Sequence, residues 1–148
     1  MESRLVAPVV NGQRDTEERA GQFSGKALVV DDEPVVRRVA ISMLQHLGFE
    51  VLEAADGRAG VDVYREHQAD IALVLLDMTM PILGGAEAYT ELRRIRPDVR
   101  VILMNGYNEQ DSTNRFAGRR PAGFVQKPLQ VSSLARTVRR VLSSESDD

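Results

Sequence analysis

Residues 71–77, IALVLLD, run through six apolar side chains in succession and end on an aspartate. A strand with one face in water would alternate apolar and polar side chains, so this continuous apolar run indicates a strand buried on both faces. Strands of this kind occur in parallel sheets that helices cover on both sides. The run therefore predicts an α/β fold built around a parallel sheet.

The segments on either side repeat the alternation of strand and helix. We predict strands at 26–30, 50–54, 71–76, 99–104 and 123–126, and helices at 34–47, 57–67, 86–95, 110–116 and 131–142. Pro34 suits the first turn of its helix, and Gly48 suits the end of that helix. Five strand–helix units in succession predict a doubly wound sheet with helices on both faces.

The predicted domain spans residues 26–142. Residues 1–25 mix polar and charged side chains without a sustained period and are expected to form a flexible leader or linker. Residues 143–148, SSESDD, are expected to form an acidic disordered tail. With so few polar residues after the last predicted helix, we expect no attached output domain.

Composition excludes several functional classes. The 43% hydrophobic and 28% charged residues are ordinary for a globular protein, and a net charge of −3 provides no basic field, so direct nucleic-acid binding is not expected. The absence of cysteine removes disulfides and thiol chemistry, which fits a reducing cytoplasm. No apolar run reaches bilayer length and the N-terminus lacks a signal-peptide layout, so we expect a cytoplasmic protein without membrane insertion.

Polar residues follow four of the predicted strands. These residues are Asp31-Asp32 after LVV, Asp77 after IALVLL, Asn105-Gly106 after VILM, and Lys127-Pro128 after GFVQ. A single aspartate after a strand is most often a turn or helix-capping residue. In an open parallel sheet, however, ligands bind at the carboxyl ends of the strands, so four such segments together predict one site.

The predicted site has the chemistry of phosphoryl transfer. Three neighbouring carboxylates, Asp31, Asp32 and Asp77, repel one another unless a cation offsets them, and hard oxygen ligands of this kind suit Mg²⁺. Lys127 and a metal ion can together stabilise an incoming phosphoryl group. Asp77 is the natural nucleophile, because a carboxylate can accept a phosphoryl group to give an acyl phosphate.

The segments VVDDE, LLDMTMPILGG, VILMNGY and GFVQKP, in this order, resemble the receiver domain of bacterial two-component response regulators. The resemblance covers residues 26–142. It implies a flavodoxin-like, doubly wound, five-stranded parallel sheet of order 2-1-3-4-5. It also implies that Asp77 takes a phosphoryl group from the phosphohistidine of a histidine kinase or histidine phosphotransfer protein. Such a chain is a self-phosphorylating acceptor with slow autodephosphorylation, and not a turnover enzyme.

The same resemblance assigns roles to residues of the site. Asp32 and Asp77 would bind Mg²⁺ directly, together with the backbone carbonyl of Thr79, while Asp31 would act through water. Lys127 would pair with the phosphoryl oxygens.

Further roles follow from the resemblance at residues around the site. The bond from Lys127 to Pro128 would be cis. Phe124 falls at the position of a switch aromatic that turns inward on activation, although an ordinary strand-end aromatic is an equal reading of this residue. Thr79 and Tyr107 fall where side chains tune hydrolysis of the acyl phosphate.

Arginine pairs on two predicted helices have two readings. Most such pairs are solvated helix faces. By resemblance, Arg37 and Arg38 lie on the helix that helps to dock the phosphodonor. Arg136, Arg139 and Arg140 lie on the final helix, whose surface carries output or a phosphorylation-dependent homodimer contact.

Asn105 departs from the family pattern, which has Ser or Thr there. An amide can donate a hydrogen bond to a phosphoryl group, but its carbonyl end would repel the phosphoryl oxygens if it were turned toward them. Asparagine is also longer, so the same loop movement need not follow. The hypothesis is that Asp77 is still phosphorylated while the signal to the far face is weakened.

Two other classes of protein remain as alternatives. A pseudo-receiver that binds a partner without phosphorylation is supported by Asn105 alone. A Mg²⁺-dependent aspartyl-phosphate phosphohydrolase would need a second aspartate two residues after its nucleophile, where Thr79 follows Asp77 and Glu33 follows Asp31. Within the receiver class, the chain fits a stand-alone regulator or the receiver of a hybrid histidine kinase, and the leader slightly favours the second.

Overall fold

The computed structural model describes residues 21–80, 82–105 and 120–143. Its helices and strands are, in chain order, β2 (Lys26–Val30), α2 (Pro34–Leu47), β3 (Glu50–Ala54), α3 (Gly57–His67), β4 (Ile71–Asp77), α4 (Gly85–Ile95), β5 (Val101–Asn105), β6 (Gly123–Gln126) and α6 (Val131–Ser143). All paired strands are parallel, and the sheet order is β3-β2-β4-β5-β6. Counted along the chain, this is the predicted order 2-1-3-4-5, so the predicted fold is confirmed.

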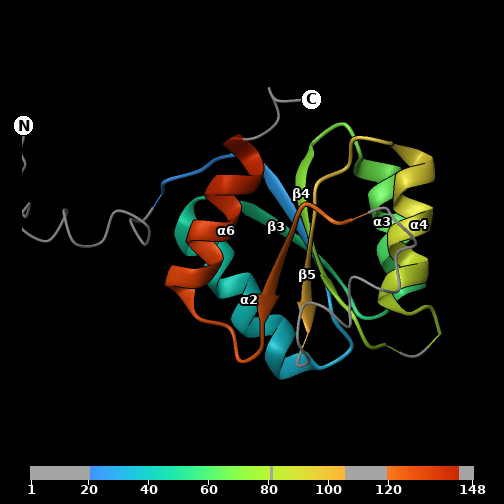
Figure 1. Ribbon diagram of the computed structural model, residues 1–148, viewed down its shortest axis with the longest axis horizontal. Helices are drawn as coiled ribbons and strands as arrows, with labels where there is room; N and C mark the ends of the chain where they lie inside the picture. The colour runs from blue at the N-terminus through green and yellow to red at the C-terminus, as the bar shows by residue number, and fades with distance from the viewer. Residues whose placement is uncertain (1–20, 81, 106–119, 144–148) are drawn as a thin grey trace, which may run out of the picture.

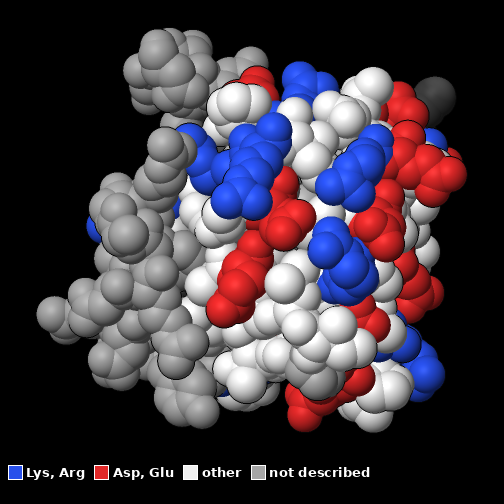
Figure 2. Space-filling model, turned by 90° about the vertical axis from the view of Figure 1, so that its right-hand side faces the viewer, with Lys and Arg blue, Asp and Glu red and all other residues white. Residues whose placement is uncertain are grey.

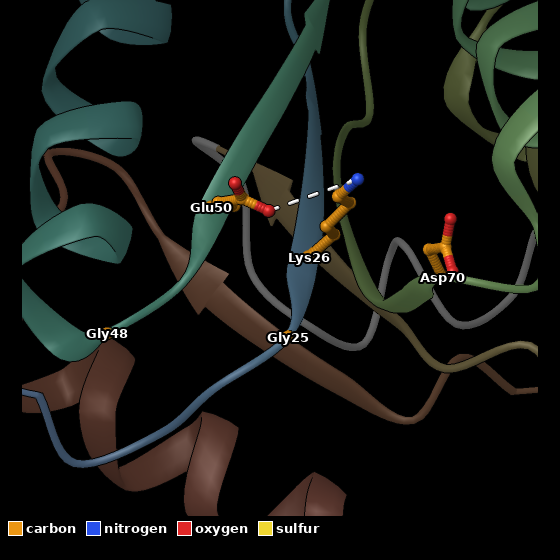
Figure 3. A pocket seen from close by; sticks show the side chains of 5 residues that line it. All are labelled: Gly25, Lys26, Gly48, Glu50 and Asp70. Atoms are coloured by element: carbon orange, nitrogen blue, oxygen red, sulfur yellow. Dashed lines mark ion pairs between the residues drawn. The ribbon is translucent and has the colours of Figure 1, made fainter.

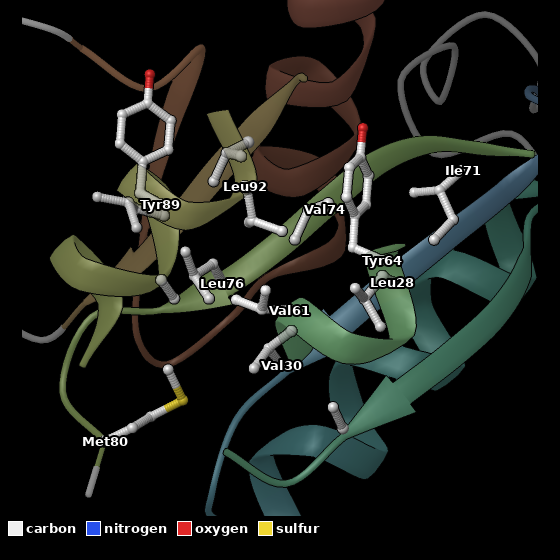
Figure 4. Close-up of a cluster of buried hydrophobic side chains, with 14 of the residues drawn as sticks. Leu28, Val30, Val61, Tyr64, Ile71, Val74, Leu76, Met80, Tyr89 and Leu92 are labelled. Atoms are coloured by element: carbon white, nitrogen blue, oxygen red, sulfur yellow. The ribbon is translucent and has the colours of Figure 1, made fainter. Parts of the chain in front are cut away.

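Helices α2 and α6 cover one face of the sheet, and α3 and α4 cover the other (Figure 1). The side chains of β4 alternate between the two cores that result. Val74 and Leu76 join the cluster shown in Figure 4, while Leu73 and Leu75 join the cluster on the opposite face. All four side chains are at most 1% exposed. The uninterrupted apolar run of β4 thus follows from burial on both faces of the central strand.

The predicted start of β5 is wrong by two residues. The backbone N–H of Val99 donates to the carbonyl of Arg96, which closes a turn around Pro97 and Asp98, so the strand begins only at Val101. An apolar residue at the end of a turn looks like the first residue of a strand in sequence alone. The predicted helix at 110–116 lies outside the described residues.

Residues just before the predicted domain make contacts with it. The last five residues of the predicted leader pack on the domain, where Phe23 stacks on Phe49 with ring centroids 5.6 Å apart. The backbone N–H groups of Gly21 and Phe23 donate to the carbonyls of His46 and Leu47 at the end of α2. Carbonyls in the last turn of a helix have no partner within the helix, so this segment satisfies two of them.

Gly48 explains why the leader can lie so close to α2. It ends the helix, as predicted, with φ of 118°, a left-handed conformation that favours glycine. A Cβ atom at this position would lie 2.0 Å from the carbonyl oxygen of Phe23. Only glycine therefore permits both the helix end and the backbone that crosses it.

At the other end of the domain, Ser143 belongs to α6 and not to the predicted tail. Its hydroxyl donates to the carbonyl of Arg139, one turn earlier in the helix, at 2.5 Å. Among the described segments of the chain, no helix is both long and apolar enough to span a bilayer.

Candidate functional site

The carboxyl ends of β2 and β4 bring together the three carboxylates that the sequence placed there. Asp77 is the last residue of β4, and Asp31 and Asp32 follow β2 directly. One carboxylate oxygen from each lies within 4.8 Å of the other two. Asp31 is fully buried and Asp77 is 3% exposed, whereas Asp32 is partly exposed. The predicted convergence of these residues is therefore present in the fold.

Lys127, which follows β6, inserts its ammonium group into this acidic cluster. Its Nζ donates to Asp77 Oδ1 at 3.0 Å and lies 3.3 Å from Asp31 Oδ2. Glu33 Oε1 lies 3.8 Å from the same nitrogen, but the Glu33 side chain is 62% exposed, so water screens this third pairing. Glu33 was not among the predicted site residues, although it is the third acidic residue of the segment VVDDE.

Burial and neighbouring charges together shift the pKa values of Asp77 and Lys127 upward. Burial raises the pKa of Asp77 to about 6; the hydrogen bond from Lys127 opposes this, and the neighbouring charge of Asp31 adds to it. Burial alone would lower the pKa of Lys127, but its hydrogen bond and charge interaction with Asp77, together with Asp31, raise it instead. By formal charge, the Lys127 ammonium group offsets only one of the three carboxylates.

The donor set fits a hard divalent cation. All three groups offer carboxylate oxygens, and Asp31 Oδ2 is a buried oxygen that accepts no hydrogen bond from any described residue. Three carboxylates and one ammonium group leave a charge near −2, which one divalent ion neutralises. Mg²⁺ prefers such ligands and retains coordination sites for water and phosphate oxygens.

Residues 27–139 match the response regulator receiver domain over most of the chain. The chain belongs to this family. Receiver domains of two-component systems signal through phosphorylation, interact with histidine kinases or phosphotransfer proteins and with downstream targets, and generally bind Mg²⁺ at an acidic pocket.

Two curated relatives with similar sequences are proteins of different kinds. Sensor kinase CckA of Brucella abortus is 33% identical over 141 residues, which are 94% of this chain but 15% of the kinase. Chemotaxis protein CheY of Thermotoga maritima is 30% identical over 117 residues, which are 78% of this chain and 96% of that protein. The chain therefore spans a small part of one relative and nearly all of the other.

Solved structures support the fold. A response regulator receiver domain protein from Clostridium thermocellum has a TM-score of 0.76 at 26% identity, covering 82% of this chain and 97% of the other. The receiver domain of the hybrid histidine kinase CckA has a TM-score of 0.66 at 31% identity, covering 80% and 99% of the two chains.

Asn105 lies at the same end of the receiver sheet as the acidic cluster. It is the last residue of β5 and is 3% exposed. Its backbone carbonyl accepts a hydrogen bond from the N–H of Lys127 at 3.1 Å, so β5 and the Lys127 loop are joined at this residue. The Lys127-Pro128 bond is cis, as the resemblance implied.

The residues predicted to switch or tune the receiver are only partly described. Phe124 in β6 packs partly against the core shown in Figure 4, and the Arg120 guanidinium carbon lies 5.8 Å from its ring centroid. The Tyr89 hydroxyl donates to the Arg120 carbonyl at 2.9 Å. Thr79 is exposed beside the site, and Tyr107 lies outside the described residues. The switch and tuning roles stay predictions.

A hollow at the opposite edge of the sheet does not belong to this site. It has a volume of about 440 Å³ and is lined by residues at the amino ends of the strands, namely Gly25, Lys26, Gly48, Glu50 and Asp70 (Figure 3). Lys26 and Glu50 form an ion pair of 3.9 Å within it. Since the acidic cluster lies at the carboxyl ends, the hollow has no part in its chemistry.

The α3–α4 face of the receiver mixes charges of both signs (Figure 2). Arg58 on α3 lies 3.9 Å from Asp62 on the same helix and 3.6 Å from Glu91 on α4, and Arg65 also pairs with Asp62. This face therefore offers no continuous basic surface to nucleic acid.

Proposed function

We propose that this receiver domain accepts a phosphoryl group on Asp77, with Mg²⁺, from the phosphohistidine of a histidine kinase or histidine phosphotransfer protein. The observation that carries the proposal is the convergence of Asp77 with Asp31, Asp32 and Lys127 at one edge of the sheet. The domain then acts as an acceptor and switch for a downstream protein, and not as a turnover enzyme.

The chemical step is a displacement at phosphorus. An Asp77 carboxylate oxygen attacks the phosphorus atom, the bond from phosphorus to the imidazole nitrogen breaks, and its electron pair stays on the imidazole. Asp77 must be ionised for this step, and a pKa of about 6 leaves it mostly ionised at neutral pH. Lys127, 3.0 Å from Asp77 Oδ1, can then pair with an oxygen of the transferred group.

Asp31, Asp32 and Asp77 are the residues that would hold Mg²⁺, with the backbone carbonyl of Thr79 as the further ligand that the resemblance implies. When bound, the ion supplies positive charge to the phosphoryl oxygens as negative charge develops on them.

Exposed apolar side chains next to the acidic cluster support docking of a protein phosphodonor. The large hydrophobic side chains that are exposed in the described part of the chain are Val35, Val39 and Ile82. The first two lie on α2, which begins just after Asp32, and Ile82 follows Asp77 by five residues. A phosphodonor must reach Asp77 from solvent, so exposed apolar residues beside the acidic cluster are well placed to contact the donor.

The backbone conformation of Ile82 is a second indication that this residue contacts a partner and does not stabilise the domain. Its φ is 71°, although its side chain is 78% exposed and gains little from packing. A left-handed backbone costs an L-residue about 1–2 kcal/mol, and strain of this kind is concentrated at functional sites. We include Ile82, Val35 and Val39 in the proposed docking surface, whereas Arg37 is engaged within the domain.

Intact-mass measurement after incubation with acetyl phosphate tests the proposed function. With Mg²⁺ we expect one phosphoryl adduct, which peptide mapping places on the segment that contains Asp77. With EDTA we expect none. No adduct in folded protein with Mg²⁺ would overturn the proposal in favour of a pseudo-receiver.

Mg²⁺ is expected to raise the melting temperature of the domain at pH 8, and the gain should shrink as the pH falls below about 6. The reason is that the proton on Asp77, whose pKa burial raises to about 6, competes with the ion for the carboxylate. Differential scanning fluorimetry across pH 5–8 measures this, with KCl at matched ionic strength as the control. A gain that does not depend on pH would contradict the involvement of Asp77.

Asn105→Ser is expected to leave phosphorylation of Asp77 intact and to increase the response at Phe124. The shorter hydroxyl can donate to a phosphoryl oxygen, whereas the amide of Asn105 also carries a repelling carbonyl oxygen. The measurement is the change in the Phe124 ring NMR signals on addition of acetyl phosphate with Mg²⁺. Equal changes in the parent and the variant would show that Asn105 does not weaken the switch.

A further inference from the structure

Arg37 and Arg38 are neighbours in the first turns of α2, but they differ in exposure and in contacts. The Arg37 side chain is 19% exposed. Arg38 is exposed, and no hydrogen bond or ion pair joins it to another residue of the described segments. The two residues carry the same charge, so Arg38 serves as a comparison for the loss of one positive charge on this helix.

The guanidinium group of Arg37 bridges two parts of the backbone. Its Nη1 donates to the backbone carbonyl of Asp31 at 2.7 Å, and its Nε donates to Glu53 Oε1 at 2.9 Å. Glu53 lies in the edge strand β3, and Asp31 begins the loop from β2 to α2. Because the donors of a guanidinium group have a fixed planar geometry, both acceptors are held relative to α2 at once.

This bridge matters because the start of α2 has little else to hold it. Glu33 precedes the helix but makes no side-chain capping bond, and Pro34 has no N–H to donate. The loop is held from inside the domain by the Asp31 N–H, which donates to the Ala54 carbonyl, and by Asp31 Oδ1, which accepts from the Glu33 N–H. Arg37 holds it from the helix side.

We propose that Arg37 is a positioning residue for metal binding, which fixes the loop that presents Asp31 and Asp32 to the cation. The inference rests on the proposed Mg²⁺ site and goes beyond it, since Arg37 itself offers no ligand. Residues that orient metal ligands typically contribute about 10–100-fold to metal affinity.

The direction of the change in Mg²⁺ affinity distinguishes a positioning role of Arg37 from an effect of its charge alone. As a cation near three carboxylates, Arg37 repels Mg²⁺, so removal of its charge alone would tighten binding. Loss of positioning would weaken binding instead, because the Asp31 carbonyl would lose its charged donor and the loop its helix-side contact. Arg38→Ala removes the same charge from the same helix and is therefore the matched control.

The test is calorimetric titration of the full chain with Mg²⁺ at pH 8. We expect Arg37→Ala to weaken affinity by about tenfold or more, and Arg38→Ala to leave it unchanged or slightly tighter. Arg37→Lys should fall between them, since one ammonium group cannot reproduce the planar two-acceptor bridge. Amide hydrogen exchange at Glu33, whose N–H donates to Asp31 Oδ1, should accelerate in Arg37→Ala and not in Arg38→Ala.

Each outcome decides between named alternatives. Affinity of Arg37→Ala equal to or tighter than that of the parent would overturn the positioning role and leave the proposed function standing. Absence of Mg²⁺ binding in the parent and in Arg38→Ala would overturn the proposed metal site and this inference with it. Circular dichroism establishes that each variant is folded; if Arg37→Ala is not, Arg37→Lys decides, and parent-like affinity there overturns the inference.

Discussion

Asp77→Asn is expected to abolish the phosphoryl adduct completely and, without metal, to raise the free energy of unfolding at pH 8. The first effect follows from chemistry, because a neutral amide cannot take the place of the carboxylate nucleophile that forms the acyl phosphate. The second follows from burial of Asp77 beside Asp31, which makes its ionised form less favourable in the folded protein than in the unfolded chain.

The sign of the pH dependence follows from the raised pKa. Asp77 has a pKa of about 6 when folded and an ordinary value of 3.8, so between these limits the folded state binds more protons. The parent therefore loses stability as the pH rises from about 4 to above 6, by on the order of 3 kcal/mol. Asp77→Asn lacks this loss, so the two proteins should differ at pH 8 and converge near pH 4.

Denaturant unfolding in EDTA at pH 4–8, together with intact mass after acetyl phosphate treatment, measures both effects. Asp62→Asn is the matched control, because it removes one carboxylate from the exposed surface of α3 and should change neither. A persisting Mg²⁺-dependent adduct in Asp77→Asn would exclude Asp77 as the acceptor. Equal stability of variant and parent at pH 8 would show that the ionised carboxylate of Asp77 does not destabilise the folded protein.

Gly85→Ala is expected to destabilise the domain by about 3 kcal/mol or more and to weaken Mg²⁺ binding. A Cβ atom at Gly85, the first residue of α4, would lie 2.6 Å from the Asp77 carbonyl oxygen and 2.7 Å from Met78 Cα. Both are backbone atoms, so the helix must move away or the end of β4 must shift. The gain of about 1 kcal/mol from alanine in a helix is too small to offset this.

Gly84→Ala provides the control for the neighbouring position. There a Cβ atom would first meet Glu87 Oε1 at 2.9 Å, the end of a flexible side chain that can rotate away. We expect a change of less than about 1 kcal/mol. Thermal and denaturant unfolding of the two variants measure the difference, and Mg²⁺ titration of Gly85→Ala shows whether the Asp77 position moves. Equal stability of both variants would show that the end of β4 can shift at little cost to make room for a Cβ atom at Gly85.

Most of the fold could be predicted because its signals are local. The apolar run of β4, Pro34 at the start of α2 and Gly48 at its end each act within a few residues. The two errors have different causes, a local turn at Val99 and a contact between residues far apart in sequence at Phe23. Val99 looks like a strand residue but closes a turn with Arg96, and Phe23 looks like part of a leader but stacks on Phe49.

For the site, the sequence by itself determined which residues meet: in a doubly wound sheet, parallel strands end at one edge, so Asp31, Asp77 and Lys127 had to converge there. Only the tertiary structure decided which of two adjacent arginines serves the site. Successive residues of a helix point about 100° apart, and the partner of Arg37, Glu53, comes from a strand 16 residues away. The charge and spacing of residues along the chain do not predict that geometry, because it depends on how α2 is rotated against β3.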